Sequence, residues 1–360
     1  MTTTMTQTTR HHSEPRLPAE WEPHGAVLVA WPHPATDWNY MLPEVEACYT
    51  ALIETISRHA AAIVIAPDTA RPRALLADVC AGSPYPVIFF DVPTNDTWTR
   101  DYGVITTIGP DGNTILNDFG FNAWGGKFAS ELDNAVTAAM TRAGLLRGEY
   151  TDRRSLILEG GSIESDGRGT LLVTEECLLT PTRNPQLTRT EIEGALRDSL
   201  GARKVLWANG GGIVGDDTDG HIDTLARLAP GNIILHATPC VGTPDAAQGA
   251  LLEAFARSLE GMTDASGEPY SLLGIPLPEP IYDPADGSRL PATYLNYLIL
   301  NDALLMPVYG QPMADMLAQR IVRIAFPDHT IETVDCRALI RQHGSLHCAT
   351  MQIPSSALPI

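Results

Sequence analysis

Short apolar runs of strand-forming residues recur from one end of the chain to the other, and they limit the fold more than any other feature. Runs of this length and composition are typical of buried strands. Between several of them, apolar residues return at three- and four-residue steps, which predicts amphipathic helices. The expected strands are 26–31, 61–66, 86–92, 103–108, 155–161, 170–179, 232–237, 294–309 and 345–353, and the expected helices are 42–60, 131–146, 188–200, 243–262 and 311–326. The pattern indicates an α/β protein in which strand pairs with an intervening helix repeat.

The same pass along the chain predicts one domain. Residues 1–16 are polar and lack periodicity, so we expect a disordered lead followed by a single domain from 17 to 360. The proline-rich stretch 275–291 is expected to be a long surface loop. A dinucleotide-binding fold is the rival architecture, but no GxGxxG follows an expected strand, and NGGGIVGDDTDG at 209–220 has a different spacing. We therefore do not expect a dinucleotide cofactor.

Charge and cysteine usage narrow the range of partners. The formal net charge is −19, from 43 acidic and 24 basic residues. Nucleic acid and anionic membranes bind to clustered Lys and Arg, which an acidic chain of this kind does not favour. The negative charge is better suited to a cationic small molecule. The six cysteines include no CxxC pair, which favours reduced thiols over a zinc knuckle or a disulfide framework. With no signal peptide and no apolar stretch of ~20 residues, a cytoplasmic location is expected.

Two polar segments lie beside expected strands. Arg100 and Asp101 directly precede the strand 103–108, either as a charged pair at a pocket or as a surface salt bridge. Glu159 follows an apolar run and is itself followed by two glycines. Glycines let the backbone pass close to another group, so Glu159 either faces inward or belongs to an ordinary turn.

The segment GDDTDGHID, residues 215–223, holds four Asp and one His within nine residues. If its last three residues are extended, His221 and Asp223 point to the same face. An imidazole beside a carboxylate serves acid–base catalysis or binds a metal. No HxH or HExxH supplies further ligands, so no metal is expected.

Cys348 stands near the C-terminus, between His347 and a short apolar run. A free thiol has a pKa of ~8.5, so a nucleophilic cysteine needs a neighbouring base or cation. His221 could supply this only through folding. The alternative is a buried cysteine that fills space in the core.

Several motifs, in fixed order, carry a resemblance to a known family. From about residue 17 to 354, the chain resembles the agmatine deiminase and bacterial-type peptidylarginine deiminase family. This resemblance implies a pentein fold, an α/β propeller of ββαβ units with pseudo-fivefold symmetry and an active site on the central axis. The motifs are WEPHGAVLVAWPH, DTWTRDYG, FGFNAWGGKF, LEGGSIESDGRGTLLVTEECLL, RNP, DDTDGHIDTLARL and HGSLHC.

The resemblance also implies roles for individual residues. Cys348 matches the nucleophile, His221 the general acid–base, and Glu159 the acidic partner that orients the histidine. Asp101 and Asp223 match the carboxylates that grip a guanidinium group. Expected near the pocket are Asn296 and, as walls or as structural tryptophans, Trp98, Trp124 and Trp31.

The implied reaction is hydrolysis of agmatine to N-carbamoylputrescine and ammonia through a covalent cysteine thiouronium, without metal or organic cofactor, in polyamine metabolism. Deimination of arginine in peptides is the alternative, and transfer of the amidino group to an amine is a third. The chain departs from the family pattern at Ser162 and His343, two polar positions that concern the substrate tail. The resemblance is compatible with a homo-oligomer.

Overall fold

The computed structural model describes residues 14–242 and 245–359. Within them the strands form five sheets of three or four strands and one two-stranded hairpin, so the α/β prediction is confirmed. Residues 1–13 of the expected lead lie outside the described part, but Arg16 is already in place. Its backbone N and O each bond Ile108 at 2.8 Å. No helix among the described residues is long and apolar enough to cross a bilayer.

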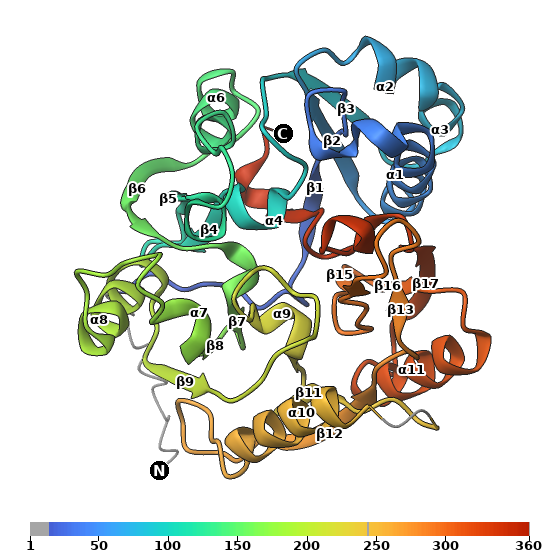
Figure 1. Cartoon of the computed structure of the whole chain (residues 1–360). Helices are drawn as coiled ribbons and strands as arrows, with labels where there is room; N and C mark the ends of the chain where they lie inside the picture. The colour runs from blue at the N-terminus through green and yellow to red at the C-terminus, as the bar shows by residue number, and fades with distance from the viewer. Residues whose placement is uncertain (1–13, 243–244, 360) are drawn as a thin grey trace, which may run out of the picture.

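The five sheets occupy five neighbouring sectors of the molecule in Figure 1. Four of them are formed from strands consecutive in sequence. In spatial order the five sheets are β18(Met351–Pro354)-β1(His24–Ala30)-β2(Ala61–Ala66)-β3(Val87–Asp91), β4(Ile105–Ile108)-β5(Thr114–Gly120)-β6(Glu149–Ile157), β7(Ile163–Ser165)-β8(Thr170–Thr174)-β9(Lys204–Ala208), β10(Ala226–Ala229)-β11(Ile233–Thr238)-β12(Ser271–Pro276) and β15(Leu298–Leu300)-β16(Ala303–Val308)-β17(Thr330–Asp335).

All five sheets share one pairing pattern. A central strand pairs antiparallel with one neighbour and parallel with the other. In the first sheet the antiparallel neighbour is β18, so the C-terminal strand completes the N-terminal unit. Parallel neighbours need a crossover connection, which helices supply. The crossover segments contain η1(Asp37–Met41) and α1(Leu42–Ile56), then α2(Ala70–Leu75) and α3(Ala77–Gly82), α5(Ala123–Gly126), η2(Asp133–Ala135) and α6(Val136–Arg142), α7(Glu175–Leu178) and α8(Arg189–Leu200), α10(Ala246–Leu259) and α11(Pro312–Ala325).

Short helical turns stand before three of the antiparallel strands. They are α4(Thr99–Tyr102) before β4, η3(Gly160–Ser162) before β7 and α9(Ile222–Leu225) before β10. Two further turns, η4(Leu339–Gln342) and η5(Ser355–Ala357), flank the last strand. These turns carry or adjoin most of the polar residues singled out above.

The buried apolar side chains form one continuous cluster. Every residue of β2 is buried, because α1 packs against it while β1 and β3 flank it. The longer helices bury one face and leave the other outside, as their apolar spacing predicts. In α10 the buried residues include Leu252, Phe255 and Leu259, which recur at three- and four-residue steps.

Several expected boundaries were wrong, as four segments illustrate. Of the expected strand 170–179, only Thr170–Thr174 is extended, because Thr174 caps the helical turn α7 with its side chain. The run 294–309 is a hairpin of β15 and β16, not one strand. Residues 346–349 form a turn, and only β18 follows them as a strand. The proline-rich loop 275–291 contains a small hairpin, β13(Ile281–Tyr282) with β14(Arg289–Leu290).

Candidate active site

The candidate site residues come from equivalent places in the five sheets. Each stands two to four residues before the strand that pairs antiparallel with the centre of its sheet. The shared pairing pattern therefore presents one polar side chain per unit at the same end of a strand, where pockets commonly form. They are Asp101 before β4, Glu159 before β7, Asp223 before β10, Asn296 before β15 and Cys348 before β18.

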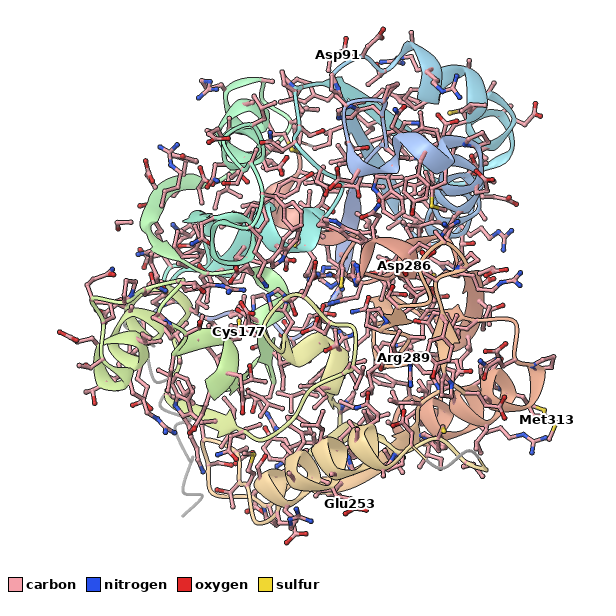
Figure 2. All side chains as sticks on the ribbon, viewed as in Figure 1. Asp91, Cys177, Glu253, Asp286, Arg289 and Met313 are labelled. Carbon is pink, nitrogen blue, oxygen red and sulfur yellow. The ribbon has the colours of Figure 1, made fainter. Side chains whose placement is uncertain are left out.

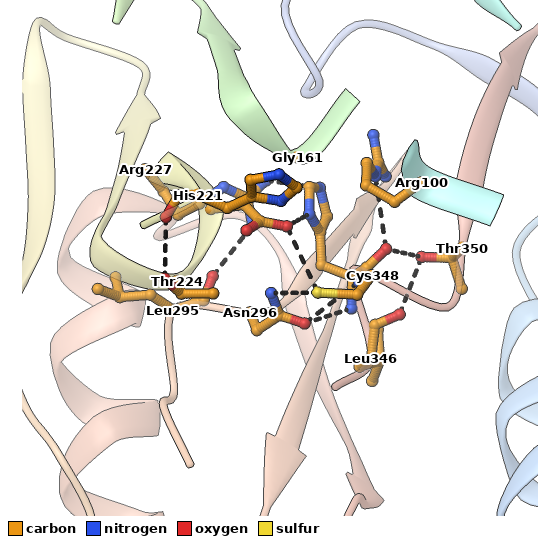
Figure 3. Close-up of polar contacts among 12 residues, drawn as sticks. Arg100, Gly161, His221, Thr224, Arg227, Leu295, Asn296, Leu346, Cys348 and Thr350 are labelled. Atoms are coloured by element: carbon orange, nitrogen blue, oxygen red, sulfur yellow. Dashed lines mark hydrogen bonds and ion pairs between the residues drawn. The ribbon is translucent and has the colours of Figure 1, made fainter. Parts of the chain in front are cut away.

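Cys348 lies in the turn before β18 and is buried. Its Sγ accepts a hydrogen bond from Asn296 Nδ2 at 3.2 Å and lies 3.7 Å from Asp223 Oδ2 (Figure 3). Asn296 Oδ1 in turn accepts from the backbone N–H of Cys348 at 3.2 Å, which fixes both residues. Burial, and then the negative charges of Asp223 and Asp101, raise the pKa of the thiol well above its ordinary value. The thiol therefore needs a nearby positive charge to ionise at neutral pH.

Asp223 does not sit on an extended segment, so the alternating-face argument for the HID sequence was wrong. His221 has φ −52° and ψ 138° and precedes α9, and Asp223 lies within this helical turn. The two side chains still meet, because the turn projects both toward Gly161. Asp223 Oδ2 accepts a 2.8 Å bond from His347 Nδ1. Burial raises the pKa of Asp223, but His347 and His221 outweigh it and leave that pKa below its ordinary value.

Asp101 lies on α4 and is almost fully buried. Its Oδ2 accepts from Trp124 Nε1 at 2.9 Å, and its Oδ1 accepts from the backbone N–H of Gly161 at 3.1 Å. Burial raises the pKa of Asp101 to about 6, with further increases from Asp223 and a reduction by His221. A pKa above the ordinary value means that the surroundings do not fully compensate the negative charge of this carboxylate.

His221 is fully buried, and its Nδ1 lies 3.7 Å from Asp101 Oδ1. Burial lowers the pKa of the imidazole, but Asp101, Cys177 and Glu159 reverse this effect and raise it well above its ordinary value. The imidazole is therefore protonated near neutral pH. Neither ring nitrogen has a geometrically well-formed hydrogen bond within the described chain.

Glu159 is buried as expected for an inward-facing carboxylate, but its main partner is Arg183. Arg183 Nε donates to Glu159 Oε1 at 2.9 Å, and neither side chain is exposed. Arg183 also contacts Asp219 and donates to the carbonyl of Thr218 at 2.8 Å. Arg183 was not predicted as a site residue. It stands in the RNP motif, but no local sequence pattern indicates that it pairs with Glu159.

Three buried groups could in principle hold a metal ion. The ligand atoms of Glu159, Cys177 and His221 lie within 4.8 Å of one another. In a tetrahedral zinc site each ligand atom lies about 2.0–2.3 Å from the ion, so the ligand atoms lie less than 4.8 Å from one another. The Arg183 guanidinium already offsets the charge of Glu159, and this disfavours a further cation at the same carboxylate.

The two glycines after Glu159 do allow close backbone approach. A Cβ at Gly160 would collide with the carbonyl oxygen of Arg100. A Cβ at Gly161 would lie 2.7 Å from His221 Nδ1, 2.9 Å from Asp101 Oδ1 and 3.0 Å from Asp223 Oδ2. Gly161 therefore keeps open the space on which an imidazole and two carboxylates converge.

A pocket of about 170 Å³ reaches Cys348 from the surface. Asp101 and two of the predicted tryptophans line it, together with three further Asp residues, whereas Trp31 lies in the core and donates to Glu46 at 3.3 Å. Ser162 does not line this pocket, because its hydroxyl donates to the carbonyl of Glu159 at 2.6 Å. The lining residues are Asp37, Asp96, Trp98, Asp101, Trp124, Phe128, Asp217, Thr218, Gln342, His343, Gly344 and Cys348.

Two of these lining residues have left-handed backbones, with φ of 54° at Trp124 and 63° at His343. This conformation is costly for residues with a Cβ and persists where the surroundings enforce it. Trp124 is held by its bond to Asp101, and His343 Nδ1 lies 2.8 Å from the carbonyl of Gly215. The strain places both side chains at the pocket.

The six cysteines are free thiols, as expected. Cys80 is exposed, whereas Cys48, Cys336 and Cys348 are buried. Cys177 is buried in the interior (Figure 2), beside His221 and Glu159. Burial raises the pKa of the Cys177 thiol.

The fold and the site together define a class of α/β protein in which a cysteine, a histidine, an asparagine and several carboxylates, drawn from the turns before equivalent strands of five sheets, lie close together. Within that class, the chain belongs to the Porphyromonas-type peptidyl-arginine deiminase family, whose sequence profile matches residues 16–354. The family expected from the motifs is thereby confirmed.

Individual relatives agree with this membership. The agmatine deiminase of Stutzerimonas stutzeri (strain A1501) is 33% identical, with 98% of this chain and 99% of that protein covered. The C. jejuni agmatine deiminase, in a variant with substrate bound, is 35% identical with a TM-score of 0.86, covering 96% and 97%. A Porphyromonas gingivalis protein with a provisional assignment as arginine deiminase is 41% identical with a TM-score of 0.87, covering 96% and 100%.

Proposed function

We propose that this protein is an agmatine deiminase, a hydrolase that converts the guanidinium group of agmatine to N-carbamoylputrescine and ammonia. The family supports a hydrolase of guanidine C–N bonds. Cys348 is the nucleophile, His221 the general acid–base, and Asp101 and Asp223 bind the guanidinium. The context of this reaction is polyamine metabolism.

One observation carries the choice of a small dicationic substrate: four Asp residues, and no Lys or Arg, are among the described residues that line the pocket. Burial raises the pKa of Asp96 and of Asp101 to about 6 each, and burial also raises the pKa of Asp217. All three line the pocket. A ligand with a positive charge at each end would offset this excess of negative charge. The volume of about 170 Å³ is below the roughly 300–1,000 Å³ of sites for drug-sized ligands.

The guanidinium would lie between Asp101 and Asp223, in the space beside Gly161. A planar guanidinium offers paired N–H donors that carboxylates accept in bidentate fashion. Two carboxylates from different turns therefore fix its plane. The indole of Trp124 orients Asp101 and contributes an apolar wall.

The first half of the reaction forms a covalent intermediate. Burial and the charges of Asp223 and Asp101 raise the pKa of Cys348, and the bound cation lowers it, so that the thiol loses its proton to solvent next to the carbon it attacks. The thiolate adds to the guanidinium carbon and forms a C–S bond. Protonated His221 gives its proton to the departing nitrogen, the C–N bond breaks, and ammonia leaves a thiouronium on Cys348.

The second half returns the enzyme to its starting state. Neutral His221 takes a proton from water, and the resulting hydroxide adds to the thiouronium carbon. The C–S bond breaks, and the ureido product and the Cys348 thiol are released. Glu159, held by Arg183, keeps negative charge beside the imidazole in both halves.

We also propose the arrangement that brings these residues together. Five sheets with one pairing pattern, each with a site residue before the same strand, support a pseudo-fivefold pentein propeller with the site at its axis (Figure 1). Residues 17–360 would then be a single catalytic domain, since the last strand pairs with the first unit. Asn296 would hold the thiol at the fifth position.

The experiment compares three substrates with the purified protein. Agmatine, free arginine and a blocked arginyl peptide are incubated separately, and ammonia and ureido product are measured. We expect turnover of agmatine. Turnover of the peptide alone would move the assignment to peptidylarginine deimination, which the description of the matching family keeps as the second candidate.

A further inference from the structure

A single carboxylate outside the pocket binds the neighbours of the candidate site residues. Glu20 belongs to the segment before β1, and its side chain is 19% exposed. Its Oε1 accepts from Arg100 Nη1 at 3.0 Å and from His347 Nε2 at 2.8 Å. Its Oε2 accepts from Arg227 Nη2 at 2.5 Å and from Gln352 Nε2 at 3.1 Å. Four donors thus converge on one acidic group.

These donors come from segments far apart in the sequence. Arg100 lies on α4, Arg227 on β10, and Gln352 on β18. Two of the donors are direct chain neighbours of proposed site residues, because Arg100 precedes Asp101 and His347 precedes Cys348. Glu20 therefore ties together the turns that carry the pocket.

His347 is the most direct link. It lies between two carboxylates, with Nδ1 2.8 Å from Asp223 Oδ2 and Nε2 2.8 Å from Glu20 Oε1. Donation to both requires a proton on each ring nitrogen. Arg227 Nη2 lies 3.2 Å from Nε2, so the imidazole and this guanidinium share Glu20 as a partner.

Further contacts fix the surroundings of Glu20. Arg227 is fully buried, pairs with Glu164 and donates to the carbonyl of Leu295 at 3.1 Å (Figure 3). Burial raises the pKa of Glu20, but His347, Arg227 and Arg100 outweigh it and hold that pKa well below its ordinary value. Glu20 is therefore ionised near neutral pH.

We propose that Glu20 is a positioning residue of the active site, which acts through His347 to hold Asp223, and with it the adjoining Cys348, in the geometry for guanidinium attack. The inference deepens the proposed function and rests on it for the identity of the substrate. It adds the N-terminal segment before β1 to the working parts of the enzyme.

The change Glu20→Gln tests the proposal with almost no change in shape. Both carboxylate oxygens of Glu20 accept hydrogen bonds. In either orientation of the new amide, its NH₂ group would therefore replace an acceptor and point at a donor. Displacement of reacting groups by about 1 Å costs up to about 100-fold in rate. We expect kcat/KM for agmatine to fall about 30-fold or more, with a rise of KM, since Asp223 also holds the bound substrate.

Glu22→Gln is the matched control on the same segment. Glu22 pairs with Arg16, and their side chains are 32% and 42% exposed. This variant should keep kcat and KM within about twofold, because exposed pairs contribute only about 0–1 kcal/mol. Kinetics are measured well below the melting temperature of each variant. A role limited to folding would lower kcat through the active fraction and leave KM unchanged, and that result would overturn the proposal, as would wild-type kinetics.

Two additions keep the outcome decisive. If Glu20→Gln does not fold, His347→Gln carries the test, because it removes the link to Asp223 and leaves both arginines paired with Glu20. Labelling of Cys348 by a haloacetamidine, a reactive guanidinium mimic, is measured in parallel. Slower labelling in the variants supports positioning even if wild-type protein does not turn over agmatine, which would refute the proposed substrate alone. Labelling at the wild-type rate in a folded variant would refute the positioning role.

Discussion

The change Gly161→Ala probes the space that the proposed guanidinium site requires. The backbone of Gly161 is not in the left-handed region, so alanine fits its conformation. The added methyl would lie 2.7 Å from His221 Nδ1, 2.9 Å from Asp101 Oδ1 and 3.0 Å from Asp223 Oδ2. To restore an ordinary contact of 3.4 Å, these groups must retreat by about 0.4 to 0.7 Å.

The expected loss follows from this displacement. Misplacement of reacting groups by about 1 Å costs up to about 100-fold, which equals about 2.7 kcal/mol in the activation barrier. All three neighbours move here, and the methyl also occupies part of the guanidinium space. We therefore expect kcat/KM for agmatine to fall by about 100-fold or more, measured as ureido product at a temperature well below the melting point.

Gly194→Ala is the control for this experiment. Gly194 lies on α8, and no atom stands within 4 Å of the position of a new Cβ. Alanine in a helix is favoured over glycine by about 0.5–1 kcal/mol, so this variant should melt at the same or a higher temperature with full activity. Activity of Gly161→Ala within threefold of the wild type would refute the placement of the substrate beside Gly161.

Three further predictions concern charges in the site. The kcat/KM for agmatine should fall as pH drops through about 6, because protonation of Asp101, with its pKa of about 6, removes a carboxylate that the cation needs; a profile flat from pH 5 to 7 would contradict this. Trp124→Phe removes a donor that lowers the pKa of Asp101, so the acid limb of the same profile should move to higher pH, and a shift to lower pH would count against the assignment. Arg183→Gln leaves Glu159 buried without its partner and should reduce the free energy of unfolding by about 3–5 kcal/mol. The exposed control Arg189→Gln should reduce it by less than about 1 kcal/mol. Equal effects of the two changes in urea melts would show that the buried pair contributes no more to stability than the exposed one.

Local sequence patterns predicted the elements of the fold well. The strands of the first sheet and the long helices follow apolar periodicity, which is a local property. The helix expected at 42–60 spans Leu42–Ile56 in the structure, and the helix expected at 311–326 spans Pro312–Ala325. Boundaries failed where a polar side chain bends the backbone, as Thr174 does at the start of α7.

The residues that the motifs named lie close together in the structure, but their connections were not predicted. The motifs named Cys348, His221 and Glu159, and the glycines after Glu159 correctly indicated close backbone approach. The same patterns gave no sign that Arg183 binds Glu159. Such pairs join residues that only the folded chain brings together, and no periodicity encodes them.

Glu20 shows the same limit more sharply. It directly precedes the WEPHG motif and sits in a polar segment, where an acidic residue is unremarkable. Its importance appears only when Arg100, Arg227 and His347 are seen around one carboxylate. The buried arginines in two motifs were the available signal, because a buried guanidinium requires an acidic partner.

The central claim is that Cys348 in this pocket deiminates agmatine. The most direct measurement compares wild-type protein with Cys348→Ser, side by side, for ammonia and for N-carbamoylputrescine identified by mass spectrometry. The account predicts equal amounts of both products from the wild type and neither from the variant, with unchanged melting temperatures. Product from the variant at the wild-type rate, or none from the wild type, would contradict it.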